Sequence, residues 1–190
     1  MQDMKQKKVL PKAISQSFFL VGKKVLFIIA PAGFREEELF EPKAVLESAG
    51  AQTFIASRKT GTIQGAGGGK ASATIALASA DATDHDAIVF VGGSGAEAYF
   101  NDATAQKIAK DAFDKGKILA AICIAPSILA NAGILKGKKA TCFSSEAGNL
   151  KAKGASYTGQ AVTVDGKIIT ANGPGAARQF GQEIAKALAK

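Results

Sequence analysis

Apolar residues in this chain gather in short continuous runs, separated by longer segments in which they recur every three or four positions. The runs lie at residues 24–30 (KVLFIIA), 86–91 (DAIVFV) and 117–122 (KILAAI). An unbroken apolar run of this length is typical of a strand that is buried on both faces of a parallel sheet. Helical spacing follows these runs, and the segments concerned are 36–49, 102–115, 125–132 and, at the end of the chain, 175–189.

Weaker patterns fill the rest of the chain. Residues 51–56 predict a further strand, and the glycine-rich segment 58–77 predicts a hairpin or an irregular excursion rather than a helix. The remaining predictions are a short strand at 139–143 and a hairpin with arms at 160–164 and 167–171, joined by the favoured two-residue turn Asp165-Gly166. Because strands alternate with helices along the whole length, we predict a doubly wound α/β fold with a mostly parallel sheet and helices on both faces.

Length and composition fit one folded domain. The chain has 190 residues, of which 47% are apolar and 21% are charged, so it has enough apolar residues for a hydrophobic core. We predict that residues 1–22 are an extension ahead of a single domain at 23–190. No apolar run approaches the roughly 18 to 20 residues of a membrane-spanning helix, and no secretory cleavage site follows the N-terminal segment. We therefore expect a cytoplasmic protein without a membrane partner.

The net charge of +8 raises the question of nucleic-acid binding. Residues 1–24 contain six lysines and one aspartate, so this segment carries +5 and the rest of the chain only +3. The basic residues form a tail rather than a patch interleaved with aromatic side chains. We therefore expect no nucleic-acid partner.

The chain has two cysteines, which we expect to be free thiols, and Cys123 directly follows the strand predicted at 117–122. The segment AAICIAP has the layout of a nucleophile elbow, in which a strand turns sharply into a helix and exposes one side chain. The residues two positions before and after must be small, and here they are Ala121 and Ala125. A helix dipole at this position would favour a thiolate. The alternative is a small buried core residue.

Two further strand ends carry residues that suit a reactive thiol. Gly92 and Gly93 follow the strand at 86–91, where glycine lets backbone N–H groups approach a ligand, so the N–H groups of Gly93 and Ile124 are candidates for an oxyanion hole. The alternative is a plain glycine turn. Three glutamates, at 36 to 38, begin the first helix. One of their carboxylates could exchange a proton with the thiol, or all three could simply be exposed acidic residues at the start of a helix. The pattern does not choose among the three.

The segments FIIAPAGFREEELFEP, DAIVFVGG, AAICIAP and ANGPG, taken together and in this order, resemble the ThiJ/PfpI superfamily over about residues 23–190. The resemblance implies a flavodoxin-like fold of the class I glutamine amidotransferase type, a homodimer or larger oligomer, a reactive elbow cysteine, and no metal or organic cofactor. The positions that it implies are the nucleophile Cys123, the acidic partner Glu38, the oxyanion donors Gly93 and Ile124, and the loop Gly173-Pro174-Gly175 at the pocket rim.

The chain departs from this family at its histidines. Protease-like members have a histidine directly after the cysteine, where this chain has Ile124, and deglycase members often have one in the region that corresponds to Thr141–Phe143. The single histidine, His85, precedes the strand at 86–91, and we expect a surface or turn residue at the amino end of the sheet. No Cys–His pair would then form within one subunit.

Two other residues have open interpretations. Cys142 is either a core residue of its strand, which we favour, or a redox partner near Cys123. Lys70, in the segment GGGK, is either a solvated loop lysine, which we favour, or a basic residue near the pocket.

With the resemblance, these residues predict a cysteine-dependent enzyme of glyoxalase or deglycase type that acts on a small-molecule carbonyl substrate. Cys123 would attack the aldehyde of a reactive dicarbonyl such as methylglyoxal, or of its adducts, while Glu38 would move protons. The alternative is a redox-sensing stress protein or chaperone that uses oxidation of the same thiol. The missing histidine disfavours a cysteine peptidase or amidase.

Overall fold

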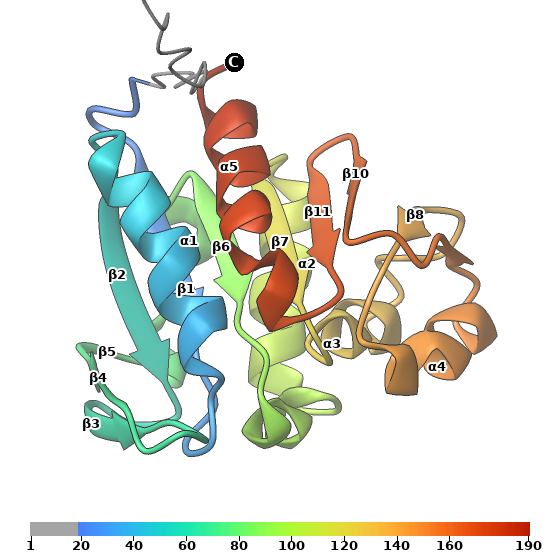
Figure 1. Cartoon of the computed structure of the whole chain (residues 1–190), viewed down its shortest axis with the longest axis horizontal. Coiled ribbons are helices and arrows are strands. Elements are labelled where there is room, and N and C mark those ends of the chain that lie inside the picture. Colours follow the sequence, from blue (N-terminus) through green and yellow to red (C-terminus); the bar gives the residue numbers. More distant parts are fainter. Residues whose placement is uncertain (1–18) are drawn as a thin grey trace, which may run out of the picture.

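The computed structural model describes residues 19–190, and a seven-stranded sheet forms its centre, with the strand order β10-β11-β7-β6-β1-β2-β5 (Figure 1). The strands are β1 (Lys24–Ile28), β2 (Gln52–Ser57), β5 (Ile75–Ala76), β6 (Ala87–Phe90), β7 (Ile118–Ile122), β10 (Val162–Asp165) and β11 (Ile168–Ala171). Neighbouring strands are parallel except at one edge, where β10 pairs antiparallel with β11. The carboxyl ends of the parallel strands meet at the lower edge in Figure 1.

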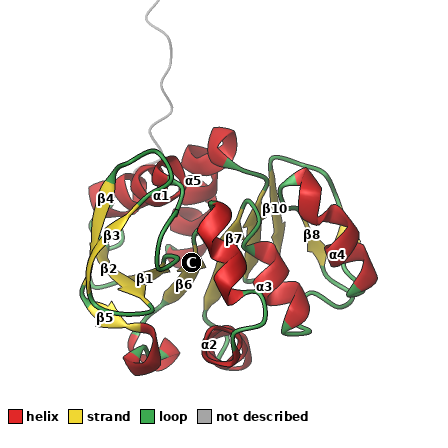
Figure 2. Cartoon of the chain, turned by 90° about the horizontal axis from the view of Figure 1, so that it is seen from below, coloured by secondary structure: helices red, strands yellow, loops and turns green. Residues whose placement is uncertain are grey.

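Helices cover both faces of the sheet, as Figure 2 shows from that lower edge. The helices α1 (Glu36–Ser48) and α5 (Ala177–Leu188) pack on one face, and α2 (Ala103–Asp114) and α3 (Pro126–Asn131) pack on the other. The predicted flavodoxin-like, doubly wound α/β fold with a mostly parallel sheet is therefore confirmed.

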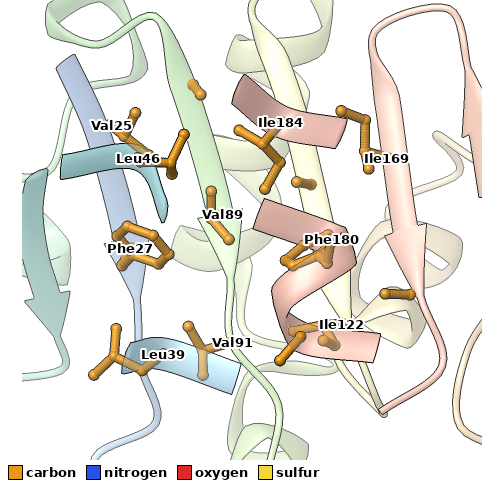
Figure 3. Close-up of a cluster of buried hydrophobic side chains, with 14 of the residues drawn as sticks. Val25, Phe27, Leu39, Leu46, Val89, Val91, Ile122, Ile169, Phe180 and Ile184 are labelled. Atoms are coloured by element: carbon orange, nitrogen blue, oxygen red, sulfur yellow. The ribbon is translucent and has the colours of Figure 1, made fainter. Parts of the chain in front are cut away.

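Each central strand contributes to two separate cores. In β1, Val25 and Phe27 face α1 and α5, whereas Leu26 and Ile28 face α2 and α3. Figure 3 shows the first of these cores, in which Phe27 lies with other apolar side chains of both helices and strands. Burying one such side chain stabilises the fold by about 1.5–3 kcal/mol, so a strand that is buried on both faces must be apolar at every position.

The segment 58–77 forms a hairpin, as predicted. Its strands are β3 (Gly61–Gln64) and β4 (Lys70–Ala73), and the short strand β5 that follows joins the edge of the central sheet. Lys70 is exposed at the start of β4. The favoured interpretation of Lys70 as a solvated residue therefore agrees with the structure.

The region after α3 differs from the sequence prediction. The strand β8 (Lys139–Ala140) is shorter than the predicted 139–143, and the helix α4 (Ala147–Ala152) and the strand β9 (Ser156–Tyr157), which pairs with β8, were not predicted. Only Leu150 of α4 is buried, so a six-residue helix of this kind has no helical pattern that the sequence would reveal. Short 3-10 turns complete the structure at Leu77–Ser79, Ala82–Asp84, Ser94–Tyr99, Ser144–Glu146 and Pro174–Ala176.

His85 lies in the turn before β6, at the amino end of the sheet, which agrees with the prediction of a surface or turn residue there, but it is buried rather than at the surface. The side chain is 7% exposed, because its ring packs edge-on against Phe54 with centroids 5.4 Å apart. Its Nδ1 lies 3.0 Å from the carbonyl oxygen of Asp81. Since β6 and β7 run parallel, the start of β6 and the end of β7 lie at opposite edges of the sheet, and the single histidine is remote from Cys123.

Most of the extension predicted at residues 1–22 lies outside the described residues. Within the described part, Leu20 is fully buried in the first core and its N–H donates to the carbonyl of Ala49 at 2.7 Å. None of the helices among residues 19–190 combines the length and apolarity needed to cross a bilayer.

Candidate active site

Cys123 occupies the sharp turn between β7 and α3. It has a φ of +64° and is the only non-glycine residue with a positive φ among residues 19–190. Two backbone hydrogen bonds hold this turn: Cys123 donates to the carbonyl of Ala171 at 2.9 Å, and its own carbonyl accepts from the N–H of Phe143 at 2.7 Å. A left-handed backbone at a residue with a side chain costs on the order of 1–2 kcal/mol, and such strain is typical of functional sites.

The three glutamates at the start of α1 have three different environments. Glu36 accepts two backbone hydrogen bonds, at 2.8 and 2.9 Å, from the glycine-rich turn 65–69. Glu37 forms an exposed ion pair with Arg35 at 2.8 Å. Glu38 is fully buried. The sequence pattern did not choose among the three glutamates, and the structure identifies Glu38 as the one whose carboxyl is buried.

Gly92 lies between the carboxyl of Glu38 and Cys123. A methyl group built on Gly92 would overlap Oε2 of Glu38 and lie 2.5 Å from Cβ of Cys123. Its neighbour Gly93 has a φ of +96°, and a methyl group there would overlap the backbone of the loop that leads into α1. Only glycine at both positions lets β6, β7 and the first turn of α1 approach one another this closely.

The backbone N–H groups of Gly93 and Ile124 both lower the pKa of the Cys123 thiol, so both favour the ionised sulfur. The structure thus brings together five of the residues that the sequence singled out: Cys123, Glu38, Gly92, Gly93 and Ile124. They come from three strand ends that lie side by side at the carboxyl edge of the sheet.

Burial raises the pKa of Glu38 from 4.5 to about 7. The nearby Cys123 thiol, the charge of Arg35 and the N–H of Gly92 offset part of this rise. Among the described residues, no donor makes a well-aligned hydrogen bond to either carboxyl oxygen. A buried carboxyl without full hydrogen bonding favours its neutral form, so Glu38 titrates near neutral pH.

Burial, and next the negative charge of Glu38, raise the pKa of the Cys123 thiol to about 11. The N–H groups of Gly93 and Ile124 lower this pKa, but by less. The expectation that Cys123 ionises readily is wrong, because the effects of burial and of the Glu38 charge exceed those of the backbone N–H groups before α3, a helix of only six residues. At neutral pH the pair therefore holds a proton on sulfur, and a carboxyl beside it is ready to accept that proton.

A hollow of about 400 Å³ lies beside the elbow, lined by Phe143, Tyr157, Asn172 and the loop Gly173–Gly175, among others. The predicted rim residues Gly173 and Pro174 belong to this hollow rather than to the immediate surroundings of Glu38. Sequence reasoning gave Phe143, which is 46% exposed, no role of its own, because the apolar pattern does not distinguish an exposed phenylalanine from a core one. The resemblance pointed only to the region Thr141–Phe143, as the place of a missing histidine.

Cys142 is 1% exposed and packs in the core beneath α2 and α3, whereas Cys123 belongs to the core on the opposite face of the sheet. Cys142 lies two residues beyond the end of β8, and burial raises its pKa to about 12. The structure therefore agrees with the favoured interpretation of a core residue. Within residues 19–190, no group of three or more His, Cys, Asp or Glu side chains is placed to hold a metal ion.

We predict that Glu38→Gln changes how stability depends on pH. Because folding raises the pKa of Glu38 from 4.5 to about 7, its contribution to stability is fully present below pH 4.5 and is lost as the pH rises through 7. Between pH 5 and pH 8, the wild type should lose about 2.5 kcal/mol more unfolding free energy than the variant. Urea unfolding of both proteins at the two pH values measures this difference, and parallel curves would contradict a raised pKa.

The fold and this site together define a flavodoxin-like α/β protein with a cysteine on a nucleophile elbow beside a buried carboxyl. The model of the DJ-1/PfpI family matches residues 23–187, and the chain belongs to this family. The predicted ThiJ/PfpI relationship is thereby confirmed.

Known relatives are similar over most of the chain. An uncharacterized protein of Methanocaldococcus jannaschii is 44% identical over 170 residues, which cover 88% of this chain and 83% of the relative. A deglycase of Thermococcus kodakarensis is 33% identical over 163 residues, covering 86% and 98%. The crystal structure of a ThiJ/PfpI domain protein from Brachyspira murdochii superposes with a TM-score of 0.86 at 36% identity, covering 88% and 98%.

Proposed function

We propose that this protein is a cysteine-dependent, cofactor-free enzyme of glyoxalase or deglycase type that acts on small reactive dicarbonyls or their adducts. The observation that carries the proposal is the fully buried carboxyl of Glu38, with a pKa of about 7, packed against the elbow that presents Cys123. A general base is most effective when its pKa lies near the working pH. The relatives that are named deglycases support the same class of chemistry.

With methylglyoxal as substrate, the first step is attack of the Cys123 sulfur on the aldehyde carbon. The thiol proton passes to the Glu38 carboxylate, and the carbonyl oxygen becomes the hydroxyl of a hemithioacetal by taking that proton back. The N–H groups of Gly93 and Ile124 favour the ionised sulfur, and in this proposal they stabilise the negative oxygen as it forms.

In the second step Glu38 removes the hydrogen from the former aldehyde carbon. The electron pair forms an enediolate, and return of the proton to the neighbouring carbon gives a lactoyl thioester on Cys123. Water then hydrolyses the thioester, which releases lactate and the free thiol. The sequence of steps is an internal redox exchange between two carbons, so it needs no added oxidant, reductant or cofactor.

The raised pKa of Cys123 disfavours the redox-sensing alternative. Peroxide oxidation proceeds through a thiolate, which is scarce at neutral pH when the pKa is about 11. A thiol that ionises only as its proton passes to Glu38 suits attack on a bound carbonyl better. A peptidase of the Cys–His type lacks its base, because the single histidine lies at the opposite edge of the sheet.

The test is lactate formation from methylglyoxal by the wild type, Glu38→Gln and Glu37→Gln side by side. We expect turnover by the wild type and a loss of at least about 100-fold in Glu38→Gln, because proton transfer by a positioned group contributes about 10²- to 10⁴-fold. Glu37 is exposed and paired with Arg35, so Glu37→Gln should retain the wild-type rate. Absence of lactate with the wild type between pH 6 and 9 would refute the proposal.

A further inference from the structure

The hollow beside Cys123 is attached to the elbow on two sides. Phe143, in one wall, donates its N–H to the carbonyl of Cys123 at 2.7 Å. Asn172, in another, follows Ala171, whose carbonyl accepts from the N–H of Cys123 at 2.9 Å. Both walls are therefore held directly to the backbone of the residue that carries the thiol. Cys123 is not itself a lining residue, so these backbone contacts are what place the hollow beside the elbow. From this placement we infer that the hollow is the space for the remaining atoms of a substrate held at the sulfur.

The described residues that line the hollow carry no charge. Their polar groups are the hydroxyls of Ser144 and Tyr157, the amide of Asn172 and the thiol of Cys142, whose residue is only 1% exposed. The rest of the surface is apolar side chain and glycine backbone. Two charged residues contact or adjoin the lining without belonging to it: Lys151 lies over the ring of Tyr157, 5.3 Å from its centroid, and Glu146 accepts from hydroxyl groups. A charged substituent would lose its hydration here without gaining a partner.

Phe143 gives the hollow an aromatic surface. Its ring lies against the backbone of Gly173, since a methyl group built there would sit 3.5 Å from Cδ2 of Phe143. The side chain is nevertheless 46% exposed, so part of the ring remains open to solvent. An exposed ring beside flat backbone is a surface on which a second planar group gains dispersion and aromatic contacts.

We propose that this hollow selects the substrate, and that the enzyme prefers 2-oxoaldehydes with an uncharged planar substituent, such as phenylglyoxal, over those with a small or charged one. Phe143 is the residue that determines this specificity. The inference rests on the proposed function for its chemistry, but it concerns the shape and charge of the site rather than the reaction.

The first experiment compares kcat/KM for phenylglyoxal and methylglyoxal in the wild type, Phe143→Ser and Phe113→Ser. Phe113 is a matched control, because it is 40% exposed and lies at the end of α2, next to the start of β7 rather than its end. We expect the preference for phenylglyoxal to fall about tenfold in Phe143→Ser, through a higher KM, as expected for loss of one aromatic contact and its buried area. Phe113→Ser should keep the wild-type preference.

The second experiment needs no turnover and measures alkylation of Cys123 by three reagents, located by peptide mass spectrometry. In each case a sulfur–carbon bond forms and iodide leaves, but iodoacetamide is small and neutral, iodoacetanilide adds a phenyl group, and iodoacetate is anionic. Relative to free cysteine, the wild type should react at least about tenfold faster with iodoacetanilide than with either other reagent. Phe143→Ser should lose this advantage, whereas Phe113→Ser should keep it.

The two experiments separate failure of this inference from failure of the proposed function. Preferential alkylation by iodoacetanilide without any turnover would refute the reaction and leave the aromatic subsite supported. Turnover without a phenyl preference, or a preference that survives in Phe143→Ser, would overturn the inference. Faster reaction with iodoacetate would overturn it as well, since it would require a cationic site that the described lining lacks.

Discussion

Replacing Cys123 with alanine is expected to reduce lactate formation from methylglyoxal to the rate measured without protein, a loss of at least about 1000-fold. The reason is that no other described residue offers a nucleophile at the carboxyl edge of the sheet beside a buried base. Cys142 is the natural comparison, because it is the second thiol of the chain but packs in the opposite core at 1% exposure. Cys142→Ala should therefore retain the wild-type rate.

The same position allows a test of the elbow strain. Cys123 has a φ of +64°, which glycine adopts at little cost but alanine does not. Cys123→Gly and Cys123→Ala should both be inactive, while the glycine variant should be the more stable of the two by about 1 kcal/mol in urea unfolding. If Cys123→Ala keeps its activity, the thiol is not the nucleophile. Equal stability of the two variants would show that the turn stores no strain.

Most of the fold could be predicted from the sequence because its central strands are buried on both faces. Residues 25–30 and 87–91 are apolar at every position, since each strand serves two cores, and this pattern leaves few alternatives to a parallel sheet. The elements that were not predicted, β5, α4 and β9, have only two to six residues. Elements of this length form through tertiary contacts, and their own sequence carries too little pattern to reveal them.

The candidate site was predictable in part. The small neighbours of Cys123 indicated a sharp turn, and the glycines after β6 indicated a close approach to it. The ionisation of Cys123 was not predictable, because it depends on which of three consecutive glutamates is buried. The contact between α1 and Gly92 determines which glutamate is buried. Glu38 and Gly92 lie more than fifty positions apart in the chain, so they touch only in the folded protein.

The same contact accounts for how Glu38 acquires its properties. A carboxyl on the first turn of an exposed helix would ordinarily stay ionised and hydrated. Here α1 is held against the sheet by its buried side chains Leu39 and Leu46, so the adjacent Glu38 is carried into the interior with it. Burial makes the ionised carboxylate costly, and this raises the pKa of Glu38 to about 7, so that the carboxyl can act as a base near neutral pH. The same shift lowers the stability of the folded protein above pH 7.

Gly92→Ala is expected to disable the site by steric displacement alone. The added methyl group would overlap Oε2 of Glu38 and lie 2.5 Å from Cβ of Cys123 and 2.8 Å from the carbonyl oxygen of Ile122. These atoms belong to α1 on one side and to consecutive residues at the end of β7 on the other, so the carboxyl and the thiol must move apart. A misplacement of about 1 Å in a catalytic pair costs on the order of 100-fold, and overpacking a closed site costs about 1–3 kcal/mol of stability.

Gly148→Ala separates this steric effect from the general consequence of replacing glycine. Gly148 lies in α4 with open space around it, so alanine there should stabilise the protein by up to about 1 kcal/mol and leave lactate formation unchanged. Lactate assays and urea unfolding of both variants give the comparison. A Gly92→Ala protein with normal turnover would mean that close contact between Glu38 and Cys123 is not required for the chemistry, and the proposed proton transfer between them would have to be abandoned.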